Sequence, residues 1–136
     1  MNSRTKGLEL WRHALVASVR SENPDLSARQ MALTLTVYLS EGPHTVRGLA
    51  ANLKISKPAV SRALDRLGEL GFLARRRDEM DRRNVLVEKT PAGTAFLEGF
   101  ASMILQAQAH IAALAETETD VSTGSETRAP RAAGVA

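Results

Sequence analysis

The sequence predicts a mainly α-helical protein with a small β-hairpin, and three observations support this fold class. Apolar residues recur at helical spacing over most of the chain up to about residue 115. Two short helical segments separated by a tight turn occupy residues 45–70, and the periodicity then changes to that of strands over residues 72–88. This order is typical of a winged helix-turn-helix, here flanked by one further helix at each end.

The chain has 136 residues, the size of one ordinary domain, and its 43% hydrophobic content is enough for a modest core. The absence of cysteine excludes disulfides, thiolate zinc sites and cysteine-based peroxide sensing. No apolar run reaches the roughly 18 residues that a membrane-spanning helix needs. We therefore expect a cytoplasmic protein with no membrane partner.

The N-terminal region, residues 1–26, is predicted to contain an amphipathic helix from Leu8 to Arg20, because its apolar residues recur at three- and four-residue steps. A mostly buried second helix follows, with Ser27 as its N-cap and Gln30 completing a capping box. Gly42 and Pro43 end this helix. The residues expected to face inward from it are Met31, Leu33, Leu35, Val37 and Leu39.

The helix-turn-helix is predicted within residues 27–90. Thr45 is the expected cap of a short helix that ends near Leu53, and a tight turn at Lys54-Ile55 follows. Ser56 then caps the next helix, which has Pro58 in its first turn and which Gly71 closes. Its apolar stripe of Val60, Leu64 and Leu67 leaves the outward positions to Lys57, Ser61, Arg62, Asp65 and Arg66.

The predicted hairpin pairs residues 72–77 with residues 84–88 through a charged loop, residues 78–83, that is long enough to reach outward. Thr90 and Pro91 start a C-terminal helix over residues 91–116. Both terminal helices carry more apolar surface than a monomer of this size easily covers, so we expect them to form a homodimer. Residues 117–136 have the composition of a disordered tail.

Charge is unevenly distributed along the chain. The whole sequence has a net charge of +3, but residues 45–90 hold eleven Lys or Arg against six Asp or Glu, a net charge of +5, and the remainder is at −2. Such a basic segment favours a polyanion-binding face, with a solvated charged surface as the alternative.

Double-stranded DNA is the polyanion that the predicted geometry favours. The major groove admits one α-helix, whose N-terminal residues lie nearest the base edges. The residues at that position are Lys57, Pro58, Ser61 and Arg62, and Arg66, one turn later, is placed to meet a backbone phosphate.

The hairpin supplies the second set of predicted DNA contacts. Arg82 and Arg83, in the loop, are the candidates for the minor groove, where negative potential is greatest. Asp81 would repel DNA unless it orients an arginine through a charge-assisted hydrogen bond, and we assign it that role. Arg75 and Arg77, on the first strand, are candidates for phosphate contact, with a solvated edge strand as the alternative.

Catalysis, cofactors and metals are not expected. The sequence has no Gly-rich phosphate loop, no nucleophile elbow and no carboxylate pair in an apolar setting. His13, His44 and His110 lack metal-ligand spacing. Two other functions stay open beside sequence-specific DNA binding: a winged-helix module that binds an acidic protein, and a weakly specific architectural DNA-binding protein.

The segment from Leu26 to about Gly93 resembles the MarR family of bacterial transcriptional regulators. Residues 49–62, LAANLKISKPAVSR, are similar to that family's helix-turn-helix, and the wing pattern Asp81-Arg82-Arg83 with the later Thr90-Pro91-Ala92-Gly93 resembles its Asp-x-Arg wing and strand exit. The resemblance implies a homodimeric transcriptional regulator whose first and last helices interlock over a near-palindromic site. It also implies DNA contacts for Ser61 and Arg62, and for Arg83 with Asp81 as its salt-bridge partner. Relatives commonly bind small aromatic effectors, but no effector site can be identified in this sequence.

Overall fold

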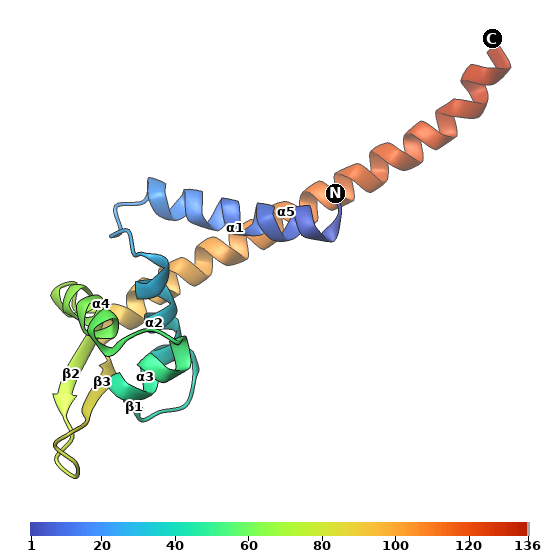
Figure 1. The fold of residues 1–136 in the computed structure, drawn as a ribbon. Helices are drawn as coiled ribbons and strands as arrows, with labels where there is room; N and C mark the ends of the chain where they lie inside the picture. Colours follow the sequence, from blue (N-terminus) through green and yellow to red (C-terminus); the bar gives the residue numbers. More distant parts are fainter. Residues whose placement is uncertain (136) are drawn as a thin grey trace. The chain divides into compact units, whose positions relative to one another are not determined.

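The computed structural model describes the backbone of residues 1–135 and the side chains of residues 1–117. Its elements, in order, are α1 (Ser3–Arg20), α2 (Ala28–Leu39), β1 (His44–Thr45), α3 (Val46–Leu53), α4 (Lys57–Glu69), β2 (Leu73–Arg77), β3 (Val85–Lys89) and α5 (Pro91–Val135) (Figure 1). The side chains of the expected disordered tail, residues 117–136, lie outside the described residues except for that of Thr117. The chain divides into two compact units, Asn23–Gly99 and Met1–Glu22 with Phe100–Ala136, and each is described by itself.

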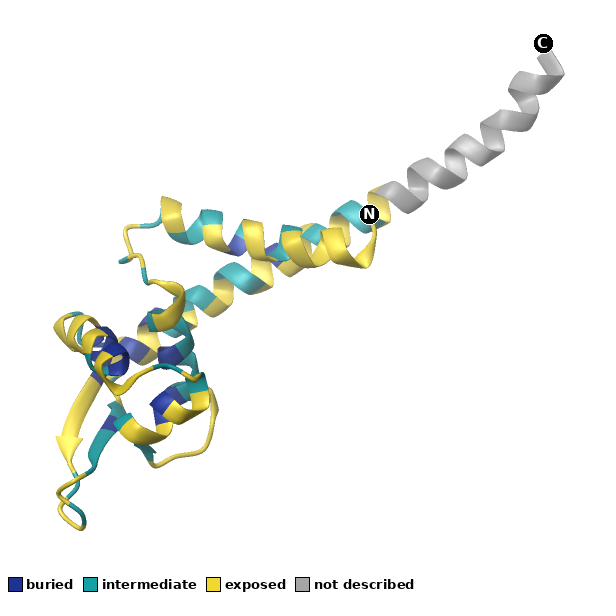
Figure 2. Cartoon of the chain, viewed as in Figure 1, coloured by how far each residue is buried: buried dark blue, intermediate teal, exposed yellow. Residues whose placement is uncertain are grey.

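The unit Asn23–Gly99 is a winged helix-turn-helix, so the predicted fold class is confirmed. Helices α2, α3 and α4 pack their apolar faces together, and most of the buried residues lie on these faces (Figure 2). The sheet and the start of α5 complete this core. Its fully or nearly fully buried members include Leu33, Val37, Leu49, Val60, Leu64, Leu67, Leu73 and Val87.

Helix α2 begins as predicted, and it buries Leu33 and Val37 as expected. Ser27 Oγ accepts from the Gln30 N–H at 3.1 Å, and Gln30 Oε1 accepts from the Ser27 N–H at 2.9 Å, which completes the capping box. The prediction that Leu39 faces inward is wrong, because Leu39 is 80% exposed. A two-residue spacing cannot stay on one face of a helix, and Thr34 takes one of the buried positions instead.

The turn between α3 and α4 depends on local side-chain caps. Thr45 Oγ1 accepts from the Gly48 N–H at 2.9 Å, and Ser56 Oγ accepts from the Ala59 N–H at 3.2 Å. Between the two helices, Lys54 adopts the left-handed conformation with φ of 55°. Both helices therefore begin where the sequence predicts, and the tight turn holds the first turn of α4 at the surface.

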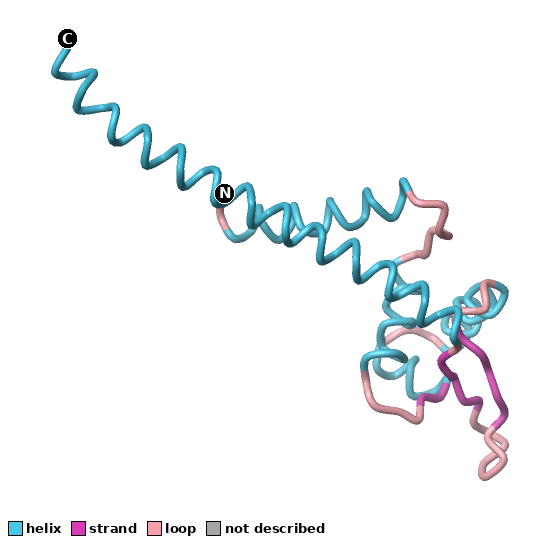
Figure 3. Tube along the Cα trace, turned by 180° about the vertical axis from the view of Figure 1, so that it is seen from behind, coloured by secondary structure: helices cyan, strands magenta, loops and turns pink. Residues whose placement is uncertain are grey.

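The sheet has three strands in the order β1-β3-β2, all antiparallel, where the sequence predicted a hairpin of two. The missed strand, β1, pairs His44 with Val87 and Thr45 with Leu86. A strand of two residues has no alternation of its own, so its sequence contains no signal for pairing. Its effect is to attach the start of α3 to β3. The loop after β2 extends past the ends of the strands when the molecule is seen from either side (Figures 1 and 3).

Tyr38 joins three segments that are distant in the sequence. Its hydroxyl donates to the Phe72 carbonyl oxygen at 2.8 Å and accepts from the Thr90 N–H at 2.9 Å. Thr90 Oγ1 in turn accepts from the Gly93 N–H at 2.9 Å, so it caps the start of α5 as predicted. These contacts connect α2, the segment between α4 and β2, and the junction of β3 with α5.

The second unit contains α1 and the part of α5 from Phe100 onward. Helix α1 begins at Ser3, five residues before the predicted start, because Asn2 accepts from the Thr5 N–H at 2.8 Å and caps it. Ala14 of α1 and Ala107 of α5 are buried, and the rings of His13 and His110 stand 4.3 Å apart. No helix among the described residues is long and apolar enough to span a membrane.

An apolar stripe on α1 remains uncovered. Leu8, Trp11, Leu15 and Val19 follow one another at three- and four-residue steps, so they share one face of the helix. Trp11 is 64% exposed and Leu8 is 70% exposed. Because such contiguous apolar surface is rare on a soluble monomer, this face is expected to be covered by another chain.

Candidate nucleic-acid interface

The first two turns of α4 display the residues predicted for the major groove. Lys57, Pro58 and Arg62 are exposed, and Ser61 is half-buried, because Ala59, Val60 and Ala63 occupy the core side of the helix. Arg66 is exposed one turn later and lies 3.8 Å from Glu69. The predicted outward face of this helix is therefore present, and the fold leaves it accessible.

The wing loop, residues 78–83, is held by carboxylates at both of its ends. Asp78 Oδ1 accepts from the Met80 N–H at 2.9 Å, and Asp81 Oδ1 accepts from the Arg83 N–H at 3.1 Å. The same Asp81 carboxylate receives Nε of Arg83 at 3.1 Å and Nη2 at 3.3 Å. Arg83 is thus aimed by its neighbour while its side chain stays 82% exposed.

Asp81 is kept ionised by these contacts. Hydrogen bonds from the Arg83 guanidinium and backbone N–H hold the pKa of Asp81 below its ordinary value; burial opposes them, and the charge of Arg47 contributes the smallest lowering effect. Because a lowered pKa keeps the carboxylate charged, the Asp81–Arg83 pair is lost only in acid below the ordinary carboxylate range. The orienting contact predicted for Asp81 is therefore formed at neutral pH.

Arg75 is placed differently from its neighbours on β2. Its Nη2 donates to Asp65 Oδ1 on α4, so its charge is partly neutralised by a residue of that helix. Arg76 is likewise paired, with Glu88 of β3 at 2.6 Å. Among the side chains that the structure describes, Arg62, Arg77 and Arg82 have no acidic partner within 4.0 Å. The pairing of Arg75 with Asp65 links the wing to α4.

Replacing Asp65 with asparagine tests how this pair controls the positive face. Asp65→Asn removes a negative charge from the exposed side of α4 and frees Arg75, so affinity for a random duplex is expected to rise several-fold. The slope of log affinity against log salt is expected to steepen by about 0.9 for each additional phosphate that is neutralised. Fluorescence anisotropy at four salt concentrations measures both quantities.

Asp25→Asn is the matched control for this prediction, because Asp25 is an exposed acid of the same unit and lies outside α4 and the sheet. It changes the net charge by the same amount. Equal affinities and slopes for the two variants would contradict a local role for Asp65.

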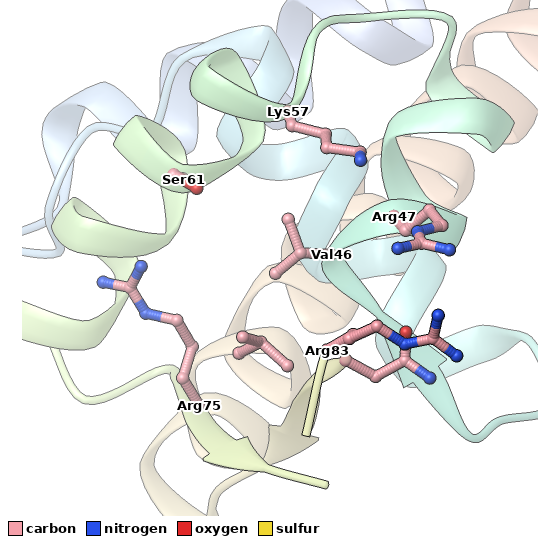
Figure 4. A pocket seen from close by; sticks show the side chains of 8 residues that line it. Val46, Arg47, Lys57, Ser61, Arg75 and Arg83 are labelled. Carbon is pink, nitrogen blue, oxygen red and sulfur yellow. The ribbon is translucent and has the colours of Figure 1, made fainter. Parts of the chain in front are cut away.

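Arg47 lies beside the predicted DNA-binding residues and was not predicted with them. Arg47 is exposed in the first turn of α3, and it lines a pocket of about 230 Å³ together with residues of α4 and the wing (Figure 4). The other lining residues are Val46, Lys57, Ser61, Arg75, Arg83, Asn84 and Val85. A basic residue directly after a capped helix start, within the +5 segment, was the available signal. Which residues share its pocket depends on the tertiary fold.

A group of ionisable residues in the other unit also went unpredicted. Glu9 Oε2 accepts from Arg12 at 2.8 Å and lies 3.4 Å from His13 Nε2, so His13 does have an acidic neighbour one turn away. The hydrogen bond from Arg12 holds the pKa of Glu9 below its ordinary value. No group of three potential metal ligands occurs among the described residues.

These features define the class of protein: a winged helix-turn-helix with a basic helix start and an arginine-bearing wing. Residues 26–85 match the family model described as the MarR family, so the resemblance found in the sequence is confirmed over this segment. The sequence matches no curated protein at a significant level.

Solved structures of MarR family regulators share the fold of this chain over most of its length. A mutant of S. aureus MepR bound to an oligodeoxyribonucleotide has 21% identity and a TM-score of 0.68, covering 95% of this chain and 93% of that one. A transcriptional regulator from Thermotoga maritima has 18% identity and a TM-score of 0.61, with coverages of 97% and 89%. MarR itself has 23% identity and a TM-score of 0.52, with coverages of 98% and 92%.

Proposed function

We propose that this protein is a transcriptional regulator that binds double-stranded DNA sequence-specifically. The observation that carries the proposal is the convergence of exposed cations from α3, the first turns of α4 and the wing on one pocket (Figure 4). A duplex presents phosphates on both sides of its major groove, so a helix and an adjacent wing with the same sign of charge suit it. The DNA complex of S. aureus MepR, with 19% identity and a TM-score of 0.59, supports this assignment.

Each predicted site residue receives a role in this proposal. Ser61 and Arg62 face base edges in the major groove, with Lys57 and Pro58 at the helix start. Arg66, Arg75 and Arg77 contact or face backbone phosphates, although Arg75 is partly neutralised by Asp65. Arg83, oriented by Asp81, enters the minor groove with Arg82 beside it.

A homodimer is the proposed binding form. The exposed apolar stripe on α1, with Trp11 and Leu8 more than half exposed, needs a partner surface, and a second copy supplies an identical stripe. Two copies related by a twofold axis would place two recognition helices about one turn of DNA, roughly 34–36 Å, apart and would match a near-palindromic site. The proposed location is the cytoplasm, on the nucleoid, and no catalytic activity is part of the function.

Selection of bound fragments from the genome of the source organism, followed by titration of the best site, tests the function. We expect a near-palindromic site and a protein-to-duplex ratio of two to one. The logarithm of the affinity should fall steeply and linearly with the logarithm of the salt concentration. Arg62→Ala is expected to alter the preference among sites, since this residue faces base edges.

Two results would overturn parts of this proposal. An absence of any salt-dependent duplex binding would favour a module that recognises an acidic protein. Salt-dependent binding with equal affinity for all sequences would favour an architectural DNA-binding protein.

A further inference from the structure

The pocket between α3, α4 and the wing concentrates positive charge that the fold itself neutralises only in part. Four of its eight lining residues are cations, and they come from separate elements: Arg47 from α3, Lys57 from α4, Arg75 from β2 and Arg83 from the wing loop. Figure 4 shows Arg47 and Arg83 on one side of the pocket and Arg75 on the other, with Lys57 directed toward the side of Arg47.

The acids near the pocket balance only half of this charge. Asp65 pairs with Arg75, and Asp81 pairs with Arg83. Among the described residues, Arg47 and Lys57 have no acidic side chain within 4.0 Å. Like charges brought together at one site raise the free energy of the unbound protein, and an anion placed between them relieves that repulsion.

Arg47 is also coupled electrostatically to the wing. Its charge acts on the carboxylate of Asp81, the residue that orients Arg83. Strand β1 holds the start of α3 against β3 through the pairs His44 with Val87 and Thr45 with Leu86. Arg47 follows β1 by two residues and Arg83 precedes β3 by two residues. The pairing of β1 with β3 therefore fixes the position of Arg47 relative to the wing.

We propose that this pocket binds one phosphate group of the DNA backbone and that Arg47 is its anchor, with Lys57 as the second cation. The inference rests on the proposed DNA-binding function and deepens it. The pocket has a volume of about 230 Å³, and a water molecule occupies about 30 Å³ in the liquid. It therefore has room for the oxygens of one phosphate group together with water. The bound phosphate sets how far the recognition helix enters the groove, and Arg47 is thus a positioning residue that reads no base.

The first test compares Arg47→Ala with Arg29→Ala, an exposed arginine of α2 that does not line the pocket. For Arg47→Ala we expect about tenfold weaker binding to the selected site and to a random duplex alike, with a salt slope shallower by about 0.9 per protomer. Arg29→Ala should match the wild-type protein. Arg47→Lys should restore the slope, because it restores the charge.

The second test locates the phosphate. Duplexes in which single phosphates are replaced by neutral methylphosphonates are titrated with the wild-type protein and with Arg47→Ala. The wild-type protein should lose affinity at one phosphate position in each half-site, and Arg47→Ala should show no further loss at that position while it responds normally at the others. This pattern would identify the partner of Arg47 atom by atom.

The outcomes separate this inference from the function on which it rests. If the wild-type protein binds no duplex, the proposed function fails. If it binds but Arg47→Ala equals Arg29→Ala, only the phosphate assignment is overturned. If Arg47→Ala changed the ratio of the affinities for the selected and the random duplex, Arg47 would read a base. If inorganic phosphate competed with DNA for the pocket at constant ionic strength, the pocket would be a site for free anions. Either result also overturns the assignment.

Discussion

Replacing Gly93 with alanine is expected to destabilise the winged domain strongly, although alanine is the better helix former. A Cβ at this position would lie 1.9 Å from the Tyr38 hydroxyl oxygen and 2.3 Å from the Phe72 carbonyl oxygen. These two atoms are hydrogen-bonded to each other, so neither can retreat without losing its partner. Overpacking costs about 1–3 kcal/mol and each buried polar group left unpaired a similar amount, so we expect a loss of at least about 3 kcal/mol.

Thermal unfolding followed by circular dichroism measures this effect, and a loss of that size lowers the melting temperature by roughly 10 °C or more. Gly99→Ala is the matched control, because Gly99 lies in the same helix and a Cβ there would meet no atom within 4 Å. It should be neutral or slightly stabilising, as expected for glycine replaced by alanine within a helix. Equal melting temperatures for the two variants would show that the contact of Tyr38 with the α5 start is not tight.

Arg83→Ala is expected to have the largest effect on DNA binding with the fold intact. The Arg83 side chain is exposed and, among the described residues, it is hydrogen-bonded only to Asp81, so its removal should leave the melting temperature unchanged. A well-oriented arginine contact with DNA is worth about 1–3 kcal/mol, and a dimer presents two wings, so affinity for the selected site should fall about 100-fold. Anisotropy titration at one fixed salt concentration measures this loss.

Asp81→Ala provides the sharper comparison. This change removes a negative charge from the wing loop, so simple electrostatics predicts tighter DNA binding. If Asp81 orients Arg83, binding should instead weaken, because the guanidinium loses the carboxylate that aims it. Tighter binding by Asp81→Ala would contradict the orienting role.

Arg76→Ala is the control for Arg83→Ala. It removes the same charge, from an arginine that is paired with Glu88.

The helix starts could be predicted from the sequence because each depends on contacts within three residues. Ser27, Thr45, Ser56 and Thr90 all cap their helices through a side-chain oxygen that accepts a backbone N–H three positions on. The outward face of α4 followed from helical spacing in the same way. Leu39 was wrongly predicted to be buried, because residues two apart do not share one face of a helix. Helix α1 begins earlier than predicted because Asn2 caps it.

Sequence alone thus determined the winged helix-turn-helix, the family resemblance and the set of candidate cations, since all of these depend on local caps, periodicity and residue type. Tertiary structure decided which cations remain unneutralised. Arg75 meets Asp65 ten residues away across two elements, and the Tyr38 hydroxyl meets Thr90 at a separation of 52 residues. Such contacts depend on how strands and helices are brought together, and charge in a protein acts through distance in space and not through distance along the chain.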